Sequence, residues 1–372
     1  MNQRIPFMSL VPGEDAGIIR QAIDRVIQRG WFILGPELAA FEDEFARASG
    51  AAHAIGVGTG TDAIALTLRA LGIGPGDEVI TTPLSAAYSA LAIMMAGATP
   101  VFADIDPRRL TVDPDAIESA ITPRTAAILP VHLYGQPADM VRIAAIAVRH
   151  GLALIEDSCQ AHLATCEGRP VGSFGAAAAF SFYPTKNLGA LGDAGAITTS
   201  DATLADKLKR VRNGGQTDRY HHVEPGWNSR LDELQAAVLR ERLQRLPALT
   251  DRRRELARRY RTGLRGGPIV VPAEHDPGHV YHLFPVLTPD RAGLMRHLDS
   301  HGIGTIIHYP VPIPRQPALA GIAPPDTCPV ADRVCAEIVS LPLHPYLTDT
   351  DADAVTSAVM TWQPTAPAPT AS

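Results

Sequence analysis

The sequence predicts an α/β fold, in which a large domain built on a mainly parallel sheet precedes a smaller C-terminal α+β domain. Between about 54 and 200, short apolar runs alternate with stretches of helical periodicity. This alternation is typical of βαβ units that form a parallel sheet covered by helices. After residue 231 the pattern changes to long helices, and the 372 residues are enough for more than one domain.

The large domain is predicted from runs of β-type residues and from the helical stretches between them. Apolar runs predict strands at 79–81, 99–102, 126–131, 152–155 and 176–182. Amphipathic patterns predict helices at 63–71, 113–121 and 138–150, and the last two end at Thr122-Pro123 and at Gly151. Parallel sheets bind ligands beyond the carboxyl ends of their strands, so the polar residues there are the candidates for function.

The C-terminal part is predicted to begin within a long helical region. A helix runs from 231 through 245, Pro247 interrupts it, and a second helix continues to about 264. A strand-like segment at 280–286, a helix at 291–301 and a proline-broken loop at 308–314 follow. We therefore expect a large domain at 1–246, a small domain at 247–362 and a disordered low-complexity tail at 363–372.

Composition excludes several classes of protein. With 33 Lys and Arg against 39 Asp and Glu, the net charge is −6, and no basic stripe suits nucleic acid. The chain has no apolar run of the ~20 residues that span a membrane and no signal peptide, which predicts a cytoplasmic protein. The 4 cysteines form no C-x-x-C pair, so no metal site is predicted and buried thiols are expected.

The segment 58–62 predicts an anion site, because it follows an apolar run and opens a helix whose first N–H groups are free. A plain helix cap is the simpler interpretation of the same pattern. Residues 58–63 also fit the G-x-G-x-x-A variant of the dinucleotide fingerprint, so an NAD-dependent oxidoreductase is an alternative. Against it, no acidic residue follows the strand at 79–81, where that fingerprint requires one.

Two further polar residues follow predicted strands. Asp157 ends the strand that begins at 152, and Lys186 comes shortly after the strand at 176–182. Taken singly, the first reads as a helix cap and the second as a surface charge. Together with the anion site they match pyridoxal 5'-phosphate, which needs a Schiff-base lysine, a phosphate cradle and a carboxylate against its pyridine nitrogen.

Longer motifs resemble one known family. They lie at 130–135, 155–160, 180–187, 192–195 and 228–235. In these motifs the chain resembles the DegT/DnrJ/EryC1/StrS sugar aminotransferases of the aspartate aminotransferase superfamily. The resemblance implies fold type I, with a mainly parallel seven-stranded sheet flanked by helices, and pyridoxal 5'-phosphate as cofactor, with pyridoxamine 5'-phosphate as its intermediate form.

The resemblance also implies roles for individual residues. Lys186 forms the Schiff base, Asp157 pairs with the pyridine nitrogen, and Gln160 lies near the 3-hydroxyl of the cofactor. The cofactor phosphate is held by Gly60, Thr61 and Ser181, with Asn228 supplied by the neighbouring subunit. Arg230 borders the partner's substrate cleft, so the active unit is expected to be a homodimer or a dimer of dimers, with no nucleic-acid or membrane partner.

The chain departs from the family pattern near the substrate. Ala86 stands where an aromatic residue usually stacks on the pyridine ring, and Tyr88, two positions later, is the candidate replacement. His308 and Tyr309 resemble the loop that closes over the sugar, and Arg315 is a candidate contact for a substrate phosphate. His132 follows a strand and is expected either to be a hydrogen-bonded core residue or to touch the cofactor.

The predicted reaction transfers an amino group from L-glutamate or glutamine to the keto group of a nucleotide-linked keto-hexose. An aminotransferase that acts on a cyclitol ketone is the first alternative. The oxidoreductase is the alternative of a different class. A dehydratase cousin of the family has histidine at the lysine position, so Lys186 argues against it.

Overall fold

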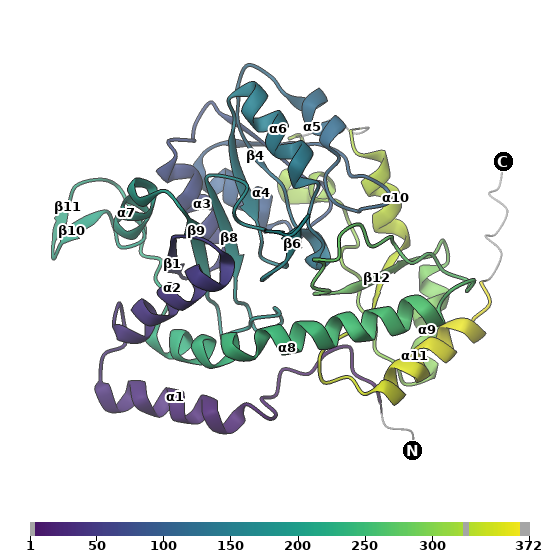
Figure 1. Ribbon diagram of the computed structural model, residues 1–372. Helices are drawn as coiled ribbons and strands as arrows, with labels where there is room; N and C mark the ends of the chain where they lie inside the picture. The colour runs from purple at the N-terminus through teal and green to yellow at the C-terminus, as the bar shows by residue number, and fades with distance from the viewer. Residues whose placement is uncertain (1–3, 323–326, 365–372) are drawn as a thin grey trace.

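A seven-stranded sheet forms the centre of the larger part of the molecule, in the order β1-β9-β8-β5-β4-β2-β3 (Figure 1). Strands β3, β2, β4, β5 and β8 are parallel, and β9 is antiparallel to both of its neighbours. The bounds are β1 His53–Val57, β2 Glu78–Thr81, β3 Thr99–Phe102, β4 Thr125–Leu129, β5 Ala153–Asp157, β8 Ala177–Ser181 and β9 Gly195–Thr199. The predicted mainly parallel sheet is confirmed, and the computed structural model describes residues 4–322 and 327–364.

Helices cover the sheet and bury its apolar residues in separate clusters. Residues of α3, α4 and α7 pack in one cluster with the sheet, those of α5 and α6 in a second, and those of α2 and α8 in a third with β8 and β9. The bounds are α2 Pro36–Ser49, α3 Gly60–Ala70, α4 Tyr88–Ala96, α5 Pro114–Ala120, α6 Met140–His150 and α7 Ala202–Val211. These clusters hold rigid the strand ends from which functional side chains project.

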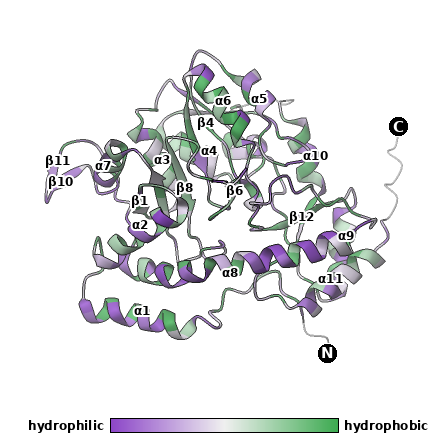
Figure 2. Cartoon of the chain, viewed as in Figure 1, coloured by the Kyte–Doolittle hydropathy of each residue, from purple (hydrophilic) through white to green (hydrophobic). Residues whose placement is uncertain are grey.

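Helix α1 (Ala16–Arg29) lies outside this core, along α8 (Figure 1). It alternates between hydrophilic and hydrophobic residues along its length, as an amphipathic surface helix does (Figure 2). Its buried residues Ile19, Ala22 and Val26 recur at helical spacing and form its contact face. The N-terminal segment that precedes it reaches the opposite end of the molecule, where Ile5 bridges Ile303.

Helix α8 (Glu233–Gly263) is one continuous helix of 31 residues, so the predicted interruption at Pro247 is wrong. A proline inside a helix removes one backbone hydrogen bond but does not end the helix where packing on both sides outweighs that loss. Here Leu246 packs in the cluster with α2, and Leu256 packs in the C-terminal cluster. The predicted domain boundary at 246/247 therefore falls inside a helix that crosses from one cluster to the other.

The C-terminal part has its own apolar cluster, built on an antiparallel pair of strands, β12 (Phe284–Leu287) and β13 (Ile338–Leu341). Helices α9 (Arg291–Ser300), α10 (Pro329–Glu337) and α11 (Asp349–Thr361) surround this pair with the last turns of α8. The predicted helix at 291–301 is confirmed, whereas only the end of the strand-like segment 280–286 is a strand. Of the predicted tail, residues 365–372 lie outside the described residues.

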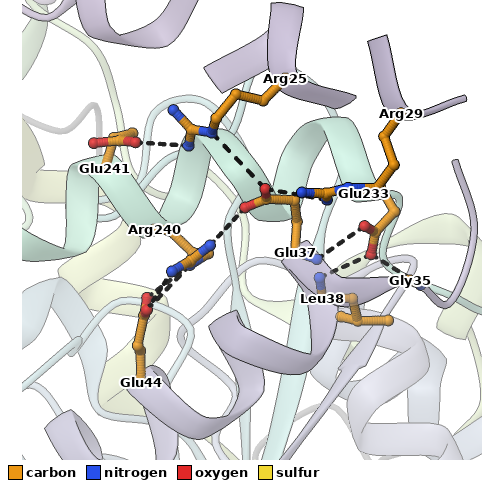
Figure 3. Close-up of polar contacts among 9 residues, drawn as sticks. All are labelled: Arg25, Arg29, Gly35, Glu37, Leu38, Glu44, Glu233, Arg240 and Glu241. Atoms are coloured by element: carbon orange, nitrogen blue, oxygen red, sulfur yellow. Dashed lines mark hydrogen bonds and ion pairs between the residues drawn. The ribbon is translucent and has the colours of Figure 1, made fainter. Parts of the chain in front are cut away.

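A buried carboxylate joins α2 to the start of α8 (Figure 3). Glu233 accepts hydrogen bonds from the backbone N–H groups of Gly35, Glu37 and Leu38, at 2.8 to 3.0 Å. A negative charge at the N-terminus of a helix is stabilised by its free N–H groups and by its dipole. The Glu37 side chain in turn accepts from Arg240 at 2.6 Å, so both helix ends are fixed beside the segment that carries Asn228 and Arg230.

Two short hairpins extend from the body. The larger one pairs β10 (Gln216–Asp218) with β11 (His221–His222) and projects outward beside α7 (Figure 1). The other pairs β6 (Thr165–Cys166) with β7 (Arg169–Pro170). Among the described residues, no helix combines the length and the apolar character that a bilayer crossing requires.

Candidate active site

A cavity of about 560 Å³ lies at the carboxyl end of the parallel strands. This is the edge at which open α/β sheets bind their ligands. Eight of the residues predicted from sequence line it: Gly60, Thr61, Tyr88, Asp157, Gln160, Ser181, Lys186 and Tyr309. The outermost of these residues in the sequence, Gly60 and Tyr309, are 249 positions apart. The fold therefore brings together residues that were predicted from separate motifs.

The N-terminus of α3 forms one wall of this cavity. The Thr59 hydroxyl caps the helix by accepting from the N–H of Asp62 at 3.0 Å. Gly60 is tightly packed, because a Cβ there would lie 2.7 Å from Ser181 Cβ and 2.8 Å from Cys159 Sγ. The first turn of α3 therefore packs against Ser181 as closely as a glycine allows. The free N–H groups of such a helix N-terminus can bind a phosphate.

Asp157 ends strand β5, and its carboxylate is held from two sides. Its Oδ2 accepts from the Ser89 hydroxyl at 2.7 Å, and its Oδ1 accepts from the backbone N–H of Cys159 at 3.1 Å. Both Asp157 and Ser89 are buried. Hydrogen bonds from these two donors fix the orientation of the carboxylate, and Asp157 lines the cavity.

Lys186 lies in the loop after β8 and reaches the same cavity. Burial lowers the pKa of its ammonium group, and the nearby Cys159 and Asp157 act in the opposite direction. Burial raises the pKa of the Cys159 thiol well above its ordinary value, and the charge of Asp157 adds to that effect. A lysine with a lowered pKa beside a buried carboxylate is suited to carbonyl chemistry, and the thiol is protonated and inert.

Gln160 connects the large domain with the loop from the small domain. Its Oε1 accepts from the N–H of Tyr134 at 2.8 Å, and its Nε2 donates to the Tyr309 hydroxyl at 3.0 Å. The Tyr134 hydroxyl donates to the carbonyl of His308 at 2.6 Å. These bonds hold the 308–309 loop against the cavity, which Tyr309 lines, and the role of this loop toward a sugar stays a prediction.

Four predicted residues do not line this cavity. Asn228 is exposed, and Arg230 donates to the Asn213 side chain at 3.1 Å. The His308 ring lies behind Tyr309, where its Nδ1 is 3.1 Å from the Ser340 hydroxyl. The Arg315 guanidinium forms an ion pair with Asp332 of α10 at 2.8 Å. Their predicted roles toward a partner subunit and a substrate remain predictions.

Sequence analysis missed several residues of the cavity wall. Ser89 stands directly after Tyr88 at the start of α4, and its role appears only when α4 is packed beside β5. Tyr183 and Asp193 both lie within motifs that carry the family resemblance, which was the available signal. At the departure from the family pattern, both Ala86 and Tyr88 line the cavity, and the Tyr88 side chain is 63% exposed.

His162 is a further residue that the sequence did not single out. It is fully buried, and its Nε2 lies 2.9 Å from the backbone carbonyl of Ser181, to which it donates. Burial, and then the charge of Lys186, lower its pKa to about 3. A neutral imidazole therefore supports the strand end that carries Ser181.

His132 is a hydrogen-bonded core residue, the first of its two predicted readings. Its ring is fully buried, with Nε2 3.1 Å from a Glu156 oxygen, and Nδ1 accepts from the N–H of Ala138 at 3.1 Å. Glu156 also accepts from the backbone N–H groups of Gly172, Phe174 and Gly175. Among the described residues, no group of three or more His, Cys, Asp or Glu is arranged to hold a metal ion.

The dinucleotide interpretation of residues 58–63 does not agree with the sheet. That fingerprint belongs to a strand inside a parallel βαβ unit, whereas β1 is an edge strand that pairs with β9 in antiparallel fashion. At the end of this strand Gly195 packs tightly against the backbone of Thr59 and Gly60, the residues that begin α3.

The sequence profile of the DegT/DnrJ/EryC1/StrS aminotransferase family matches residues 14–360. The chain belongs to this family. It is 48% identical over 366 residues to the dTDP-3-amino-3,4,6-trideoxy-alpha-D-glucose transaminase of Streptomyces venezuelae, covering 96% of each chain. It is 46% identical over 330 residues to the UDP-N-acetyl-3-dehydro-alpha-D-glucosamine 3-aminotransferase of Acidithiobacillus ferrooxidans, covering 88% of this chain and 89% of the relative.

Solved structures of the DegT/DnrJ/EryC1/StrS family share the whole fold. The crystal structure of S. venezuelae DesV in complex with a ketimine intermediate superimposes with a TM-score of 0.95 at 48% identity, covering 97% of this chain and 99% of DesV. The Bacillus subtilis ntda structure with bound pyridoxamine phosphate gives a TM-score of 0.89 at 34% identity, covering 96% of this chain and 85% of the other. This chain is therefore a fold-type I aminotransferase, and the family is pyridoxal-phosphate dependent.

Proposed function

We propose that this aminotransferase moves an amino group from L-glutamate, or from glutamine, to the keto group of a nucleotide-linked keto-hexose. One observation carries the proposal: Lys186, Asp157 and the N-terminus of α3 face the same cavity. Pyridoxal 5'-phosphate requires these three features together, and the Gly60 cradle fits its phosphate. The names of both relatives describe amino transfer on nucleotide-linked sugars, which supports this substrate class.

When bound, the cofactor supplies an electron sink that makes the α-proton of an amino acid acidic. Asp157 would pair with the ring nitrogen of the cofactor, and the Ser89 hydroxyl orients its carboxylate. Gly60, Thr61 and Ser181 would bind the phosphate, and Gln160 would lie near the 3-hydroxyl of the cofactor. Because burial lowers its pKa, Lys186 Nζ is well placed to accept the substrate α-proton and return it.

The active unit is proposed to be a homodimer with shared sites, whether or not dimers assemble further. Asn228 is exposed, and neither Asn228 nor Arg230 lines the cavity of its own chain. Trp31, Phe32 and Tyr220 are large apolar side chains that are roughly half exposed or more. Such side chains are typical of interface anchors, which supports a partner surface here.

The substrate end of the site is assigned by position. Tyr309 lines the cavity, and the carbonyl of His308 accepts a hydrogen bond from the Tyr134 hydroxyl. Tyr88, which also lines the cavity, is proposed to cover the cofactor ring, because Ala86 occupies the position where the family usually has an aromatic residue. All four cysteines are unpaired, which is consistent with the cytoplasm as the proposed compartment.

The first experiment is the absorption spectrum of the purified protein with and without L-glutamate, beside the variant Lys186→Ala. We expect a yellow wild-type protein that glutamate bleaches, and a variant that shows neither the band nor the bleaching. A wild-type protein that stays colourless after added pyridoxal phosphate would contradict the proposal.

A second measurement separates sugar nucleotides from free cyclitols as acceptors. Only a site that recognises a nucleotide has reason to bind nucleoside diphosphates. We therefore expect dTDP or UDP to inhibit the second half-reaction competitively with the keto-sugar. Absence of inhibition by both, with turnover of a cyclitol ketone, would favour the cyclitol alternative.

A further inference from the structure

A second cavity, of about 320 Å³, lies behind the loop that carries Lys186. Its walls are the loop at 184–187, the middle of α8, the N-terminal segment at 8–13 and the loop at 344–346 that follows β13. It shares Thr185 and Lys186 with the first cavity, so that loop is the partition between the two. The α3 terminus, Asp157 and Ser181 do not line it, and it is therefore separate from the cofactor site.

Three arginines of α8 line the second cavity, and two of them have carboxylate partners. Arg242 pairs with Asp15 at 2.9 Å, and Arg245 pairs with Glu14 at 2.8 Å. Arg253 is different: it is 5% exposed and forms no ion pair with any carboxylate of the described chain. Its Nη1 donates to the carbonyls of Tyr281, His282 and Leu343, at 3.0 to 3.3 Å.

Carbonyl oxygens orient the Arg253 guanidinium but do not neutralise it. Its Nε and Nη2 have no hydrogen-bond acceptor among the described residues. A buried cation without a counter-charge is strongly unfavourable, because desolvation is not compensated by pairing. The burial is deep enough to lower the pKa of Arg253 to about 10. An anion bound in the adjoining cavity would supply the counter-charge that the buried Arg253 guanidinium lacks.

His344 lines the same cavity and is also unsatisfied. It is 7% exposed, and neither Nδ1 nor Nε2 has a hydrogen-bond partner among the described residues. Burial, and then the nearby charge of Arg253, lower its pKa to about 4. The His344 ring is thus neutral near pH 7 and offers one N–H donor. A buried N–H group normally donates to a hydrogen-bond acceptor.

We propose that this second cavity is a binding site for a small oxyanion, held by Arg253 and His344. Phosphate and carboxylate share the required chemistry, because a guanidinium binds two of their oxygens with parallel N–H donors. The Asp15 carboxylate on the wall is already paired with Arg242, so the field of the cavity is positive. A bound oxyanion lies against the 184–187 loop, on the side away from the cofactor site.

The test measures anion binding to the holoenzyme by titration calorimetry, with the cofactor site saturated by pyridoxal phosphate. Inorganic phosphate and succinate are titrated separately at constant ionic strength, and the tighter one identifies the source of the oxyanion. For His344→Phe and for Arg253→Lys we expect binding about tenfold weaker, the effect of one lost charge-assisted contact. The matched control Arg258→Gln, an exposed arginine on the same helix, leaves the affinity unchanged.

Two results overturn the proposal: no binding of either anion to the holoenzyme at millimolar concentrations, or equal binding by wild type and both variants. Should Arg253→Lys fail to fold, because three carbonyls lose their donor, His344→Phe decides alone. The glutamate half-reaction is followed in parallel by absorption. Its outcome tests the proposed function independently, since anion binding does not require amino transfer.

Discussion

The Ser89 hydroxyl donates a hydrogen bond of 2.7 Å to Asp157 Oδ2, from the first turn of α4 to the end of β5. Both residues are buried, and 68 positions separate them in the chain. A hydrogen bond to a charged acceptor contributes about 1.5–3 kcal/mol. Ser89 is thus a positioning residue for the carboxylate that the cofactor requires.

Replacing Ser89 tests this role. Ser89→Ala is expected to lower kcat by about ten- to hundredfold, following from the free energy of that bond. Ser89→Thr keeps the hydroxyl and is expected to restore most of the rate. The pH midpoint of the cofactor absorption band, measured alongside, distinguishes tuning of Asp157 from a loss of stability. Equal rates for wild type and Ser89→Ala would contradict the assignment.

Gly60→Ala tests the phosphate cradle. The new methyl would lie 2.7 Å from Ser181 Cβ, so the α3 terminus has to move away from the site. We expect the dissociation constant of pyridoxal phosphate to rise at least about tenfold, since one such charge-assisted contact contributes about 1.4 kcal/mol or more. Gly17→Ala in α1, where a Cβ meets nothing within 4 Å, is the matched control and is expected to bind normally. An unaltered cofactor affinity in Gly60→Ala would show that the phosphate binds elsewhere.

Mixing two inactive variants tests the shared dimer site. Lys186→Ala lacks the Schiff-base lysine, and Asn228→Ala lacks the residue proposed to serve the partner's phosphate site. Random assortment of subunits makes half of the dimers mixed, each with one intact site, so activity is expected to recover to about a quarter of wild type. Lack of recovery, with mixed dimers verified by mass spectrometry, would place Asn228 in its own chain's function.

Arg315→Ala tests the predicted contact with a substrate phosphate. If the guanidinium binds phosphate, KM for the sugar nucleotide is expected to rise about tenfold with kcat little changed, since uniform binding is lost. Asp332→Asn removes only the ion-pair partner at 2.8 Å, and is expected to leave KM low. The contact is abandoned if Arg315→Ala leaves KM unchanged.

His162 contributes to the pH dependence of stability, as do other buried histidines whose pKa is lowered, among them His344. The folded pKa of His162, about 3, lies below the ordinary value of 6.5, so below pH 6.5 the unfolded state binds the extra proton. The contribution of neutral His162 to the free energy of unfolding is fully present above pH 6.5. It falls as the pH decreases toward 3, by about 2 kcal/mol between pH 6.5 and 5. Denaturant unfolding at several pH values is expected to show this slope, and His162→Gln is expected to flatten it. A slope that is identical in the variant would assign it to other groups.

The sequence by itself determined the five parallel strands β2, β3, β4, β5 and β8 and the residues at their carboxyl ends, whereas β1, β9 and β13 were not predicted as strands. Runs of strand-forming residues and helical periodicity are local properties of the chain. For this reason the strand predicted at 99–102 has the same bounds as the observed strand β3. The cofactor residues were accessible for a related reason, because Asp157 and Lys186 each follow a recognisable strand within a long motif.

Tertiary packing decided the rest, because it depends on contacts between distant segments. Pro247 reads as a break in the sequence, yet apolar contacts with two separate clusters keep α8 continuous across it. Ser89 was not predicted to have a role, because its contact with Asp157 exists only when α4 packs beside β5. Arg253 stands between two other arginines in the sequence, and only the fold buries it in the cavity wall with His344, without an ion pair to a carboxylate of the described chain. Burial and partner choice are global outcomes, so no local pattern could have reported them.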